Sequence, residues 1–406
     1  MYALLFTDHG LSAWQLSSLL VIWSATGIVV EVPSGALADA YSRRALLVIG
    51  PLLTAAGYAL WVGVPSYPAF AAGFVLWGIQ GSLASGALEA LVYEELDRLG
   101  AAGMYPKLTG RAHAVGVIAV LLATAGATPV LEAGGYPAVG VASVAACLLT
   151  AAVAATFPEH RGIARAAAPD LSGSADPTIL RPPDLSGAAG PTAHRPPDLS
   201  GPVAGGDAEA GIGAYLGTLR AGLAAARTDR RVRPWLLLVP AITAIWGALE
   251  EYTPLLIRQT GVPTAHVPLY YLLIYAGVSL GGVLAATGNR LSTRGFGALV
   301  AGAALLLIAG ALSGIPAGIA LVAAAFGALQ VATVVAATRL QDRITGSQRA
   351  TVTSVAALAT DLVTIGVYGA YAALSVAGPG VAFAVLTVPY LLVAARLVSA
   401  RPDGLS

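Results

Sequence analysis

The sequence predicts an all-α membrane protein: a bundle of about 11 transmembrane helices in two halves, joined by a polar linker. Of its 406 residues, 57% are hydrophobic and 11% are charged, whereas a soluble domain is roughly 45–50% apolar and about 25% charged. Seventeen of the charged residues lie within residues 158–233, which leaves long apolar windows elsewhere. A chain this apolar could not cover its surface in water, so a soluble enzyme or binding protein is excluded.

Each predicted helix is an apolar window of about 20 residues, the length that crosses the hydrocarbon core. Backbone groups in lipid must bond within the segment, and the alternation typical of a barrel strand is absent, so helices are the remaining assignment. Glycines and prolines separate adjacent windows, as at Gly134-Gly135. The predicted spans are 14–38, 45–64, 69–91, 112–131, 136–157, 234–257, 264–286, 297–313, 317–338, 350–374 and 380–398.

The distribution of lysine and arginine predicts the orientation. These residues fall in alternate loops, and the intervening loops hold only Arg258. The arginine-bearing side is therefore expected to be cytoplasmic, with the C-terminus inside and the protein in the cytoplasmic membrane. Residues 2–7 are apolar but too short to cross, so we expect them to be the end of a first helix whose beginning is missing.

The linker, residues 158–233, divides the chain into a predicted N-terminal half, 1–157, and a C-terminal half, 234–406. Pro-Asp-Leu-Ser-Gly occurs three times in it at a spacing of 14 residues. A flexible linker lengthened by duplication is favoured over a docking motif, because the segment is rich in proline, glycine and alanine. Apolar residues recur at helical spacing over 209–228, which predicts a helix on the inner membrane surface.

Several kinds of chemistry are excluded. The single cysteine, Cys147, rules out a disulfide framework and a cysteine zinc site. Histidines are too sparse for a metal site, and no phosphate-binding Gly-x-x-x-x-Gly-Lys-Ser/Thr loop is present. With net charge +1 and no basic stripe, nucleic acid is not an expected partner. No catalytic pair is visible, so neither an enzyme nor a cofactor is expected.

The most specific local pattern is Gly35-Ala-Leu-Ala-Asp39-Ala-Tyr-Ser-Arg43-Arg44, between the first two predicted spans. It resembles the loop signature of the major facilitator superfamily, from which it departs at Ser42, where the family has glycine. The resemblance implies a bundle of two repeated six-helix halves, and a weaker copy at 282–294 lies where the second half should carry it. Counting the missing helix, the 11 spans become 12. It further implies a monomeric transporter with a gating motif made of Gly35, Asp39, Arg43, Arg44 and Glu94, in which Glu94 pairs with Arg43 or Arg44.

The resemblance also implies which spans line the substrate cavity, namely 69–91, 234–257 and 317–338 with the missing first helix. Aromatic and polar residues of these spans are candidates for contact with the substrate, although packing or a solvated helix end is an alternative for each. Glu250 and Glu251 differ by about 100° in direction, so both cannot face the centre of the cavity. The candidates are Trp77, Gln80, Trp246, Glu250, Glu251, Tyr252 and Gln330.

Acidic residues within spans are costly in hydrocarbon and are candidates for proton coupling. Asp361 lies near mid-membrane, and it either accepts a proton, closes a gate, or is a buried acid held by neighbouring hydroxyl groups. Glu31 lies eight residues before Asp39, and it either carries a proton, pairs with an arginine near the inner gate, or has only a structural role as a lock. Glu89, near the inner end of its helix, offers the same alternatives.

These observations predict a secondary transporter that works by alternating access. Intramembrane acids without a paired lysine favour protons as the coupling ion, and an apolar, aromatic cavity favours export of a hydrophobic or weakly cationic compound. A proton-coupled importer or a facilitator is the alternative of the same class. A truncated membrane protein that no longer transports is the alternative of a different class.

Overall fold

The computed structural model describes residues 1–40, 42–84, 87–158, 232–288, 290–344 and 349–399, with backbone only for 31–40 and 349–351. Every regular element in these ranges is helical. The N-terminal half contains α1 (Tyr2–Asp8), α2 (Ala13–Ala40), α3 (Arg43–Gly63), α4 (Tyr67–Ala84), α5 (Ala87–Arg98) and α6 (Tyr105–Ala155). The C-terminal half contains α8 (Arg233–Gln259), α9 (Val267–Gly288), α10 (Thr293–Leu312), α11 (Gly318–Arg343), α12 (Arg349–Leu374) and α13 (Pro379–Ser399).

Two elements explain how these helices relate to the predicted spans. Within α6 the backbone is non-helical at Gly134 and Gly135, and Gly135 has φ of 62°, a conformation that glycine adopts without steric cost. This break divides α6 into two spans, as the sequence predicts. Within the described residues, nine helices are long and apolar enough to span a membrane. α8 is not among them. It contains two adjacent glutamates, and it has one arginine near each of its ends.

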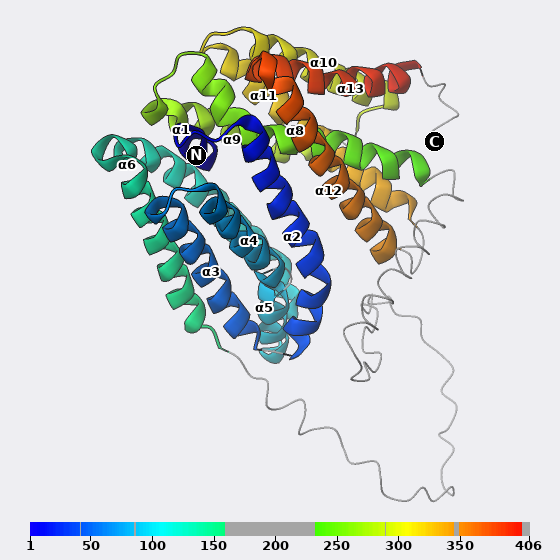
Figure 1. Ribbon diagram of the computed structural model, residues 1–406. Helices are drawn as coiled ribbons and strands as arrows, with labels where there is room; N and C mark the ends of the chain where they lie inside the picture. Colours follow the sequence, from blue (N-terminus) through cyan, green and yellow to red (C-terminus); the bar gives the residue numbers. More distant parts are fainter. Residues whose placement is uncertain (41, 85–86, 159–231, 289, 345–348, 400–406) are drawn as a thin grey trace, which may run out of the picture.

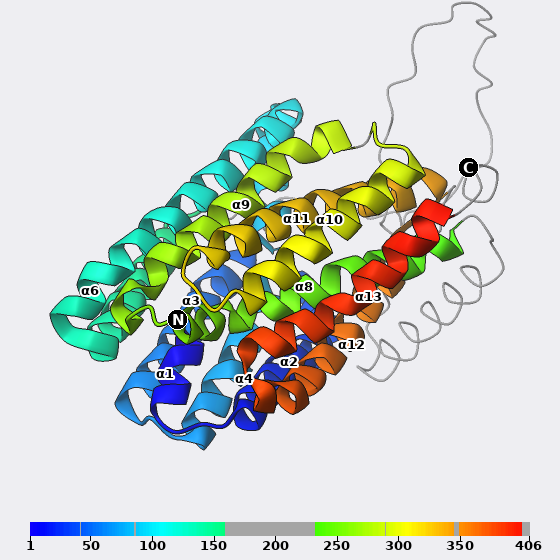
Figure 2. The ribbon, with the colours of Figure 1, turned by 90° about the horizontal axis from the view of Figure 1, so that it is seen from above.

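The two halves meet at one end and spread apart toward the other, as Figure 1 shows. In the view from above, α6 of one half runs beside α9 of the other (Figure 2). α2 contacts α12 across the boundary, and α6 contacts α9. We call the end where the halves meet the closed end. It contains α1, the break in α6, the end of α8 and the start of α9. The end of α2 and the start of α3 lie at the opposite, open end (Figure 1).

The two related loops at the open end begin their following helices in the same way. The side chain of Ser42 accepts a hydrogen bond from the Ala45 N–H at 3.0 Å, which caps α3. Ser292 caps α10 by accepting a bond from the Gly295 N–H at 3.1 Å. Serine is a preferred N-cap residue, so the departure from the family signature at Ser42 supplies a helix cap.

Small residues bring α9 and α11 into backbone contact. A Cβ atom added at Gly281 would lie 2.1 Å from the Gly327 carbonyl oxygen, and one at Gly277 would lie 2.3 Å from the Ala323 carbonyl oxygen. Close approach of this kind stabilises helix pairs in lipid, where apolar surface alone provides no driving force between helices.

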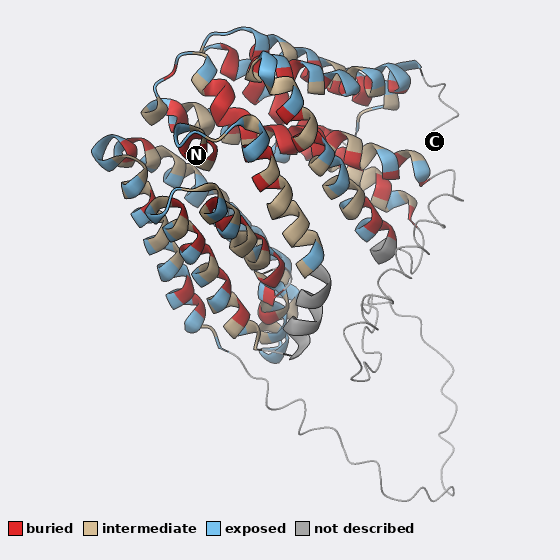
Figure 3. Ribbon diagram, in the orientation of Figure 1, coloured by how far each residue is buried: buried red, intermediate tan, exposed pale blue. Residues whose placement is uncertain are grey.

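The buried residues lie on the sides of the helices that face other helices (Figure 3). α8 is buried along much of its length, and Ile242, Ala248 and Ile257 are at most 1% exposed. In contrast, α6 exposes large apolar side chains such as Leu122, 68% exposed, and Val141, 70% exposed. Such an apolar outer surface fits contact with lipid.

Candidate functional site

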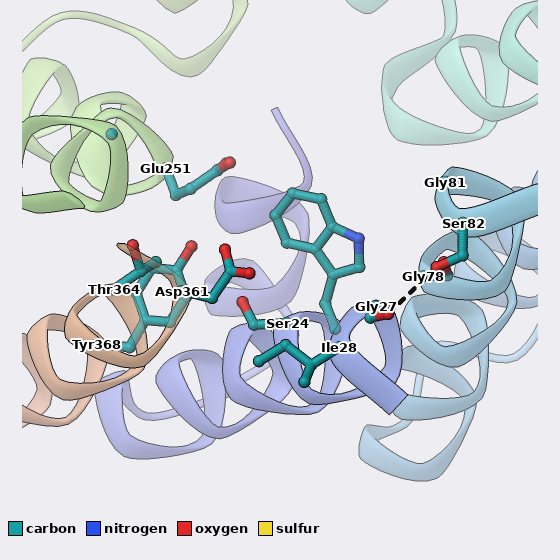
Figure 4. A pocket seen from close by; sticks show the side chains of 12 residues that line it. Ser24, Gly27, Ile28, Gly78, Gly81, Ser82, Glu251, Asp361, Thr364 and Tyr368 are labelled. Atoms are coloured by element: carbon teal, nitrogen blue, oxygen red, sulfur yellow. Dashed lines mark hydrogen bonds between the residues drawn. The ribbon is translucent and has the colours of Figure 1, made fainter. Parts of the chain in front are cut away.

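A cavity of about 430 Å³ lies between the two halves. α2 and α4 contribute one side of it, and α8 and α12 contribute the other. Figure 4 shows Asp361 of α12 and Glu251 of α8 at the same cavity, with Ser24 and Ile28 of α2. The described lining residues are Trp23, Ser24, Gly27, Ile28, Gly78, Gly81, Ser82, Gly247, Glu251, Asp361, Thr364 and Tyr368.

Two carboxylates and one indole dominate the chemistry of this lining. Glu251 and Asp361 are negative when ionised, and none of the described lining residues is a lysine, arginine or histidine. Trp23 stacks on Trp77 with ring centroids 5.0 Å apart and an interplanar angle of 17°. An aromatic face beside carboxylates is suited to binding an organic cation.

The two adjacent glutamates of α8 face different neighbours. Glu251 lines the cavity and accepts a hydrogen bond from the hydroxyl of Tyr2 in α1. Glu250 is instead directed at α9, where the Tyr271 hydroxyl lies 3.4 Å from its Oε1 atom. The difference of about 100° between consecutive helical residues separates them in this way.

Polar contacts join the halves at the closed end. Arg258 of α8 forms an ion pair with Asp8, and its Nη2 atom donates to Thr7 Oγ1 at 3.0 Å. Asp8 also accepts a hydrogen bond from the Tyr136 hydroxyl at 2.6 Å, which ties α1 to α6. Arg258 is therefore paired with Asp8. In the sequence, Arg258 stands out only as the one arginine in loops that otherwise lack lysine and arginine.

A second set of contacts at the closed end extends across the boundary. Glu132, beside the break in α6, lies 3.2 Å from the Nε2 atom of His266, just before α9. Nearer the centre, the buried Ser17 of α2 lies 2.7 Å from the Tyr252 hydroxyl of α8. Tyr252 is fully buried and stacks on Tyr371 of α12, with ring centroids 3.5 Å apart.

The residues predicted to form the gating motif lie at the open end. Arg43, at the start of α3, forms an ion pair with Glu94 of α5. Arg44 is directed elsewhere, and its Nη1 atom donates to the Phe157 carbonyl at 3.3 Å. Glu89 is exposed in the first turn of α5. For three further candidates, Glu31, Gly35 and Asp39, the structure describes only the backbone of α2 and no side-chain contacts.

The other cavity candidates do not line this cavity. Trp77 packs among aromatic rings behind Trp23. Gln80 lies in a separate hollow beside α3 and α6, because its side chain crosses Gly50 of α3. Trp246 is 7% exposed and donates to Thr333 of α11 at 3.1 Å, so the α8–α11 interface holds it. Gln330, half-buried on α11, is not among the lining residues.

The main difference from the sequence prediction concerns which helices form the cavity. α4 and α8 line it as predicted, but no described residue of α11 does, since α11 packs closely on α9, α10 and α8. α2 and α12 supply the remaining lining instead. The polar and aromatic lining residues that the sequence prediction missed are Trp23, Ser24, Ser82, Thr364 and Tyr368. An unusually polar or aromatic position within an apolar span is the signal that could have found them.

Comparisons with known proteins agree with this architecture. A protein-family model described as the Major Facilitator Superfamily matches residues 1–368. A solved structure of a mutant of the nucleoside transporter NupG has a TM-score of 0.65 at 12% identity, covering 97% of this chain and 92% of that one.

Two further solved structures have the same fold. Another structure of NupG has a TM-score of 0.63 at 11% identity, covering 98% of this chain and 93% of that one. A D-xylose–proton symporter has a TM-score of 0.59 at 16% identity, covering 98% and 91%. No curated protein sequence matches the chain.

Proposed function

The chain belongs to the Major Facilitator Superfamily and is a multi-pass secondary transporter of a small molecule, and we propose that it exports a hydrophobic or weakly cationic compound in exchange for protons. The cavity between the halves carries this proposal. Glu251 and Asp361 face it together with the Trp23 ring, and its described lining includes no basic side chain.

The charge of this lining favours a cation over an anion. At an effective dielectric constant of about 20, a monovalent cation about 4 Å from one carboxylate gains roughly 4 kcal/mol of Coulomb energy, and an anion loses as much. The face of Trp23 favours the same choice and also accepts flat apolar groups. Sugars and phosphates that carry negative charge are therefore disfavoured.

The same carboxylates support coupling to protons. Asp361 lines the cavity, so its carboxylate is accessible both to a proton and to a cationic substrate, and either one would offset a negative charge that is costly within a membrane. A carboxylate that binds one or the other couples their movements, because both ligands do not occupy it at once. We assign the coupling role to Asp361, and Glu31 and Glu89 are second candidates.

The arginine distribution supports an inward-facing assignment for this conformation. The loop with Arg43 and Arg44 lies at the open end, and the closed end holds Arg258. With the arginine-rich loops in the cytoplasm, the halves part toward the cytoplasm and meet on the outer side. Residues 158–233 and the C-terminus are then cytoplasmic, and the protein acts in the cytoplasmic membrane as a monomer.

Proton-coupled import is the second candidate function. The observation that favours it is the resemblance to a D-xylose–proton symporter, although 16% identity carries the fold and not the substrate. A facilitator would use the same cavity without a coupling proton. A protein that no longer transports remains the candidate of a different class.

A resistance assay separates these functions. Wild type and Asp361→Asn are produced at matched membrane levels in a drug-sensitive bacterial host and exposed to a panel of cationic, neutral and anionic toxic compounds. Export predicts protection against hydrophobic cations that is lost in Asp361→Asn. Increased sensitivity of the wild type would indicate import, and no effect on any compound would favour a protein that does not transport.

A further inference from the structure

Tyr2 is held in place by a cluster of aromatic rings in the N-terminal half. Its ring contacts four others at centroid distances between 5.4 and 5.9 Å. Two of these contacts, to Phe74 and Trp77 of α4, are edge-to-face, an arrangement that aromatic pairs prefer. The four rings are those of Phe6, Trp61, Phe74 and Trp77. Packing therefore fixes the direction of the Tyr2 hydroxyl.

This hydroxyl crosses from one half of the molecule to the other. It donates to Glu251 of α8, while Asp8 and Thr7, at the other end of α1, bind Arg258. Glu251 and Arg258 are seven residues apart, which places them on the same face of α8 about 10 Å apart. α1 is thus attached to α8 at both of its ends, and these attachments hold the closed end together.

Glu251 also has a second set of neighbours, because it lines the central cavity together with Asp361 and Trp23. Figure 4 shows its side chain entering that cavity from α8. A ligand in the cavity can therefore reach the carboxylate to which Tyr2 donates. Glu250 does not have this double position, since it faces Tyr271 of α9.

We propose that the Glu251 carboxylate binds the positive group of an organic monocation, and that this binding weakens the hydrogen bond from Tyr2 and so releases the closed end. This inference rests on the proposed function and adds how the ligand changes the conformation. A filled cavity then favours opening toward the closed side, which is the direction that export requires.

The physical reason is competition for the charge of the acceptor. A bound cation competes for the carboxylate oxygens of Glu251 and draws their negative charge away from the Tyr2 hydroxyl, so it weakens the Tyr2 bond even if both groups contact the carboxylate. Hydrogen bonds to an ionised group are roughly twice as strong as neutral ones. The difference corresponds to about a 5- to 10-fold decrease in the ratio of closed to open molecules. A hydrophobic monocation is the expected class, because Trp23 and the apolar lining disfavour a small hydrated ion.

The test measures the closed end directly. Nitroxide labels are attached to cysteines at Ala133, beside the break in α6, and Ala265, just before α9, in a Cys147→Ala background. Their distance distribution is measured with and without tetraphenylphosphonium, a hydrophobic monocation, and binding of the probe is measured separately. The variants are Tyr2→Phe, Glu251→Gln and Tyr271→Phe, which removes a comparable hydroxyl from the neighbouring glutamate.

In wild type, tetraphenylphosphonium is expected to lower the ratio of closed to open molecules by about 5- to 10-fold. Tyr2→Phe should have a low closed fraction without the probe, bind the probe at least as tightly, and respond to it little. Glu251→Gln should lose probe binding, and Tyr271→Phe should behave as wild type. Membrane abundance and the elution profile of each purified variant show whether it has folded.

The possible failures are distinguishable. If wild type binds the probe without any change in label distance, the inference is overturned while the proposed function stands. If Tyr2→Phe retains the wild-type closed fraction, the Tyr2 contact does not hold this end. If wild type does not bind the probe, the proposed ligand class is wrong. A drug panel without any protected compound would reject export independently.

Discussion

Replacing Gly281 with alanine is expected to destabilise the contact between α9 and α11. The new Cβ atom would lie 2.1 Å from the Gly327 carbonyl oxygen and 2.8 Å from its carbon. Ordinary contact begins near 3.4 Å, so the helices would have to separate by roughly 1 Å. The obstructing atoms are backbone, so no side-chain rotation relieves the contact.

The magnitude follows from two opposing effects. Alanine in place of glycine favours the helix by up to about 1 kcal/mol, whereas inserting a methyl group into a closely packed interior costs about 1–3 kcal/mol. The cost should fall in the upper part of that range, because separation at Gly281 also disturbs the contacts at Gly277 and Gly327. The net expectation is a loss of about 1–2 kcal/mol of unfolding free energy.

The neighbouring residue provides the control. A Cβ atom at Gly282 would have no atom within 4 Å, so Gly282→Ala keeps the helix propensity gain without the steric cost. Thermal unfolding of the purified proteins in detergent, followed by tryptophan fluorescence, compares the two variants. Gly281→Ala should melt below wild type, and Gly282→Ala at or above it. Equal melting temperatures for both variants would refute the packing argument.

Three further predictions concern transport and conformation. Asp361→Asn should remove the pH dependence of transport in proteoliposomes and weaken the binding of a cationic substrate, because it removes the carboxylate for which the two ligands compete; an unchanged pH dependence would reject the coupling role. Asp39→Asn should reduce transport more than membrane abundance, measured on the same cells, because we assign its charge to a moving gate; equal losses would mean that Asp39 only supports folding. Asp8→Asn should lower the ratio of closed to open molecules about fivefold, since it removes the Arg258 ion pair and the anionic acceptor for Tyr136. About a third of each side chain of the ion pair is exposed, so solvent screens the pair, and the fivefold change already includes this weakening. An unchanged distance between the labels at the closed end would contradict the prediction.

The helical architecture could be predicted from sequence because each span is a long apolar window with its own boundaries. Gly134 and Gly135 interrupt an otherwise continuous apolar stretch, and the structure has its non-helical break at these two residues. The recognition of the family rests on the loop that ends in Arg43 and Arg44, and the match over residues 1–368 confirms it. Local signals of this kind do not require knowledge of tertiary contacts.

The residues of the cavity were harder to predict, because the direction of a side chain depends on how each helix is rotated in the bundle. Gln80 and Gly81 are adjacent in sequence, yet Gly81 lines the cavity and Gln80 lies in a hollow on another side of α4. The angular argument for Glu250 and Glu251 correctly requires that they face different directions. It cannot decide which one faces the cavity, since an apolar helix in lipid lacks the polar face that marks rotation in a soluble protein.

The composition of α8 has a consequence for how the protein is made. α8 follows the linker and is buried against several other helices, but it is not one of the nine described segments that are apolar enough to span a membrane alone. Its two adjacent glutamates oppose partitioning from the translocon into lipid. Stable insertion of α8 therefore depends on helices synthesised after it, such as α9, α11 and α12, which contact it in the folded protein. Biogenesis of the C-terminal half is accordingly expected to be cooperative, with α8 retained near the translocon until its partners emerge.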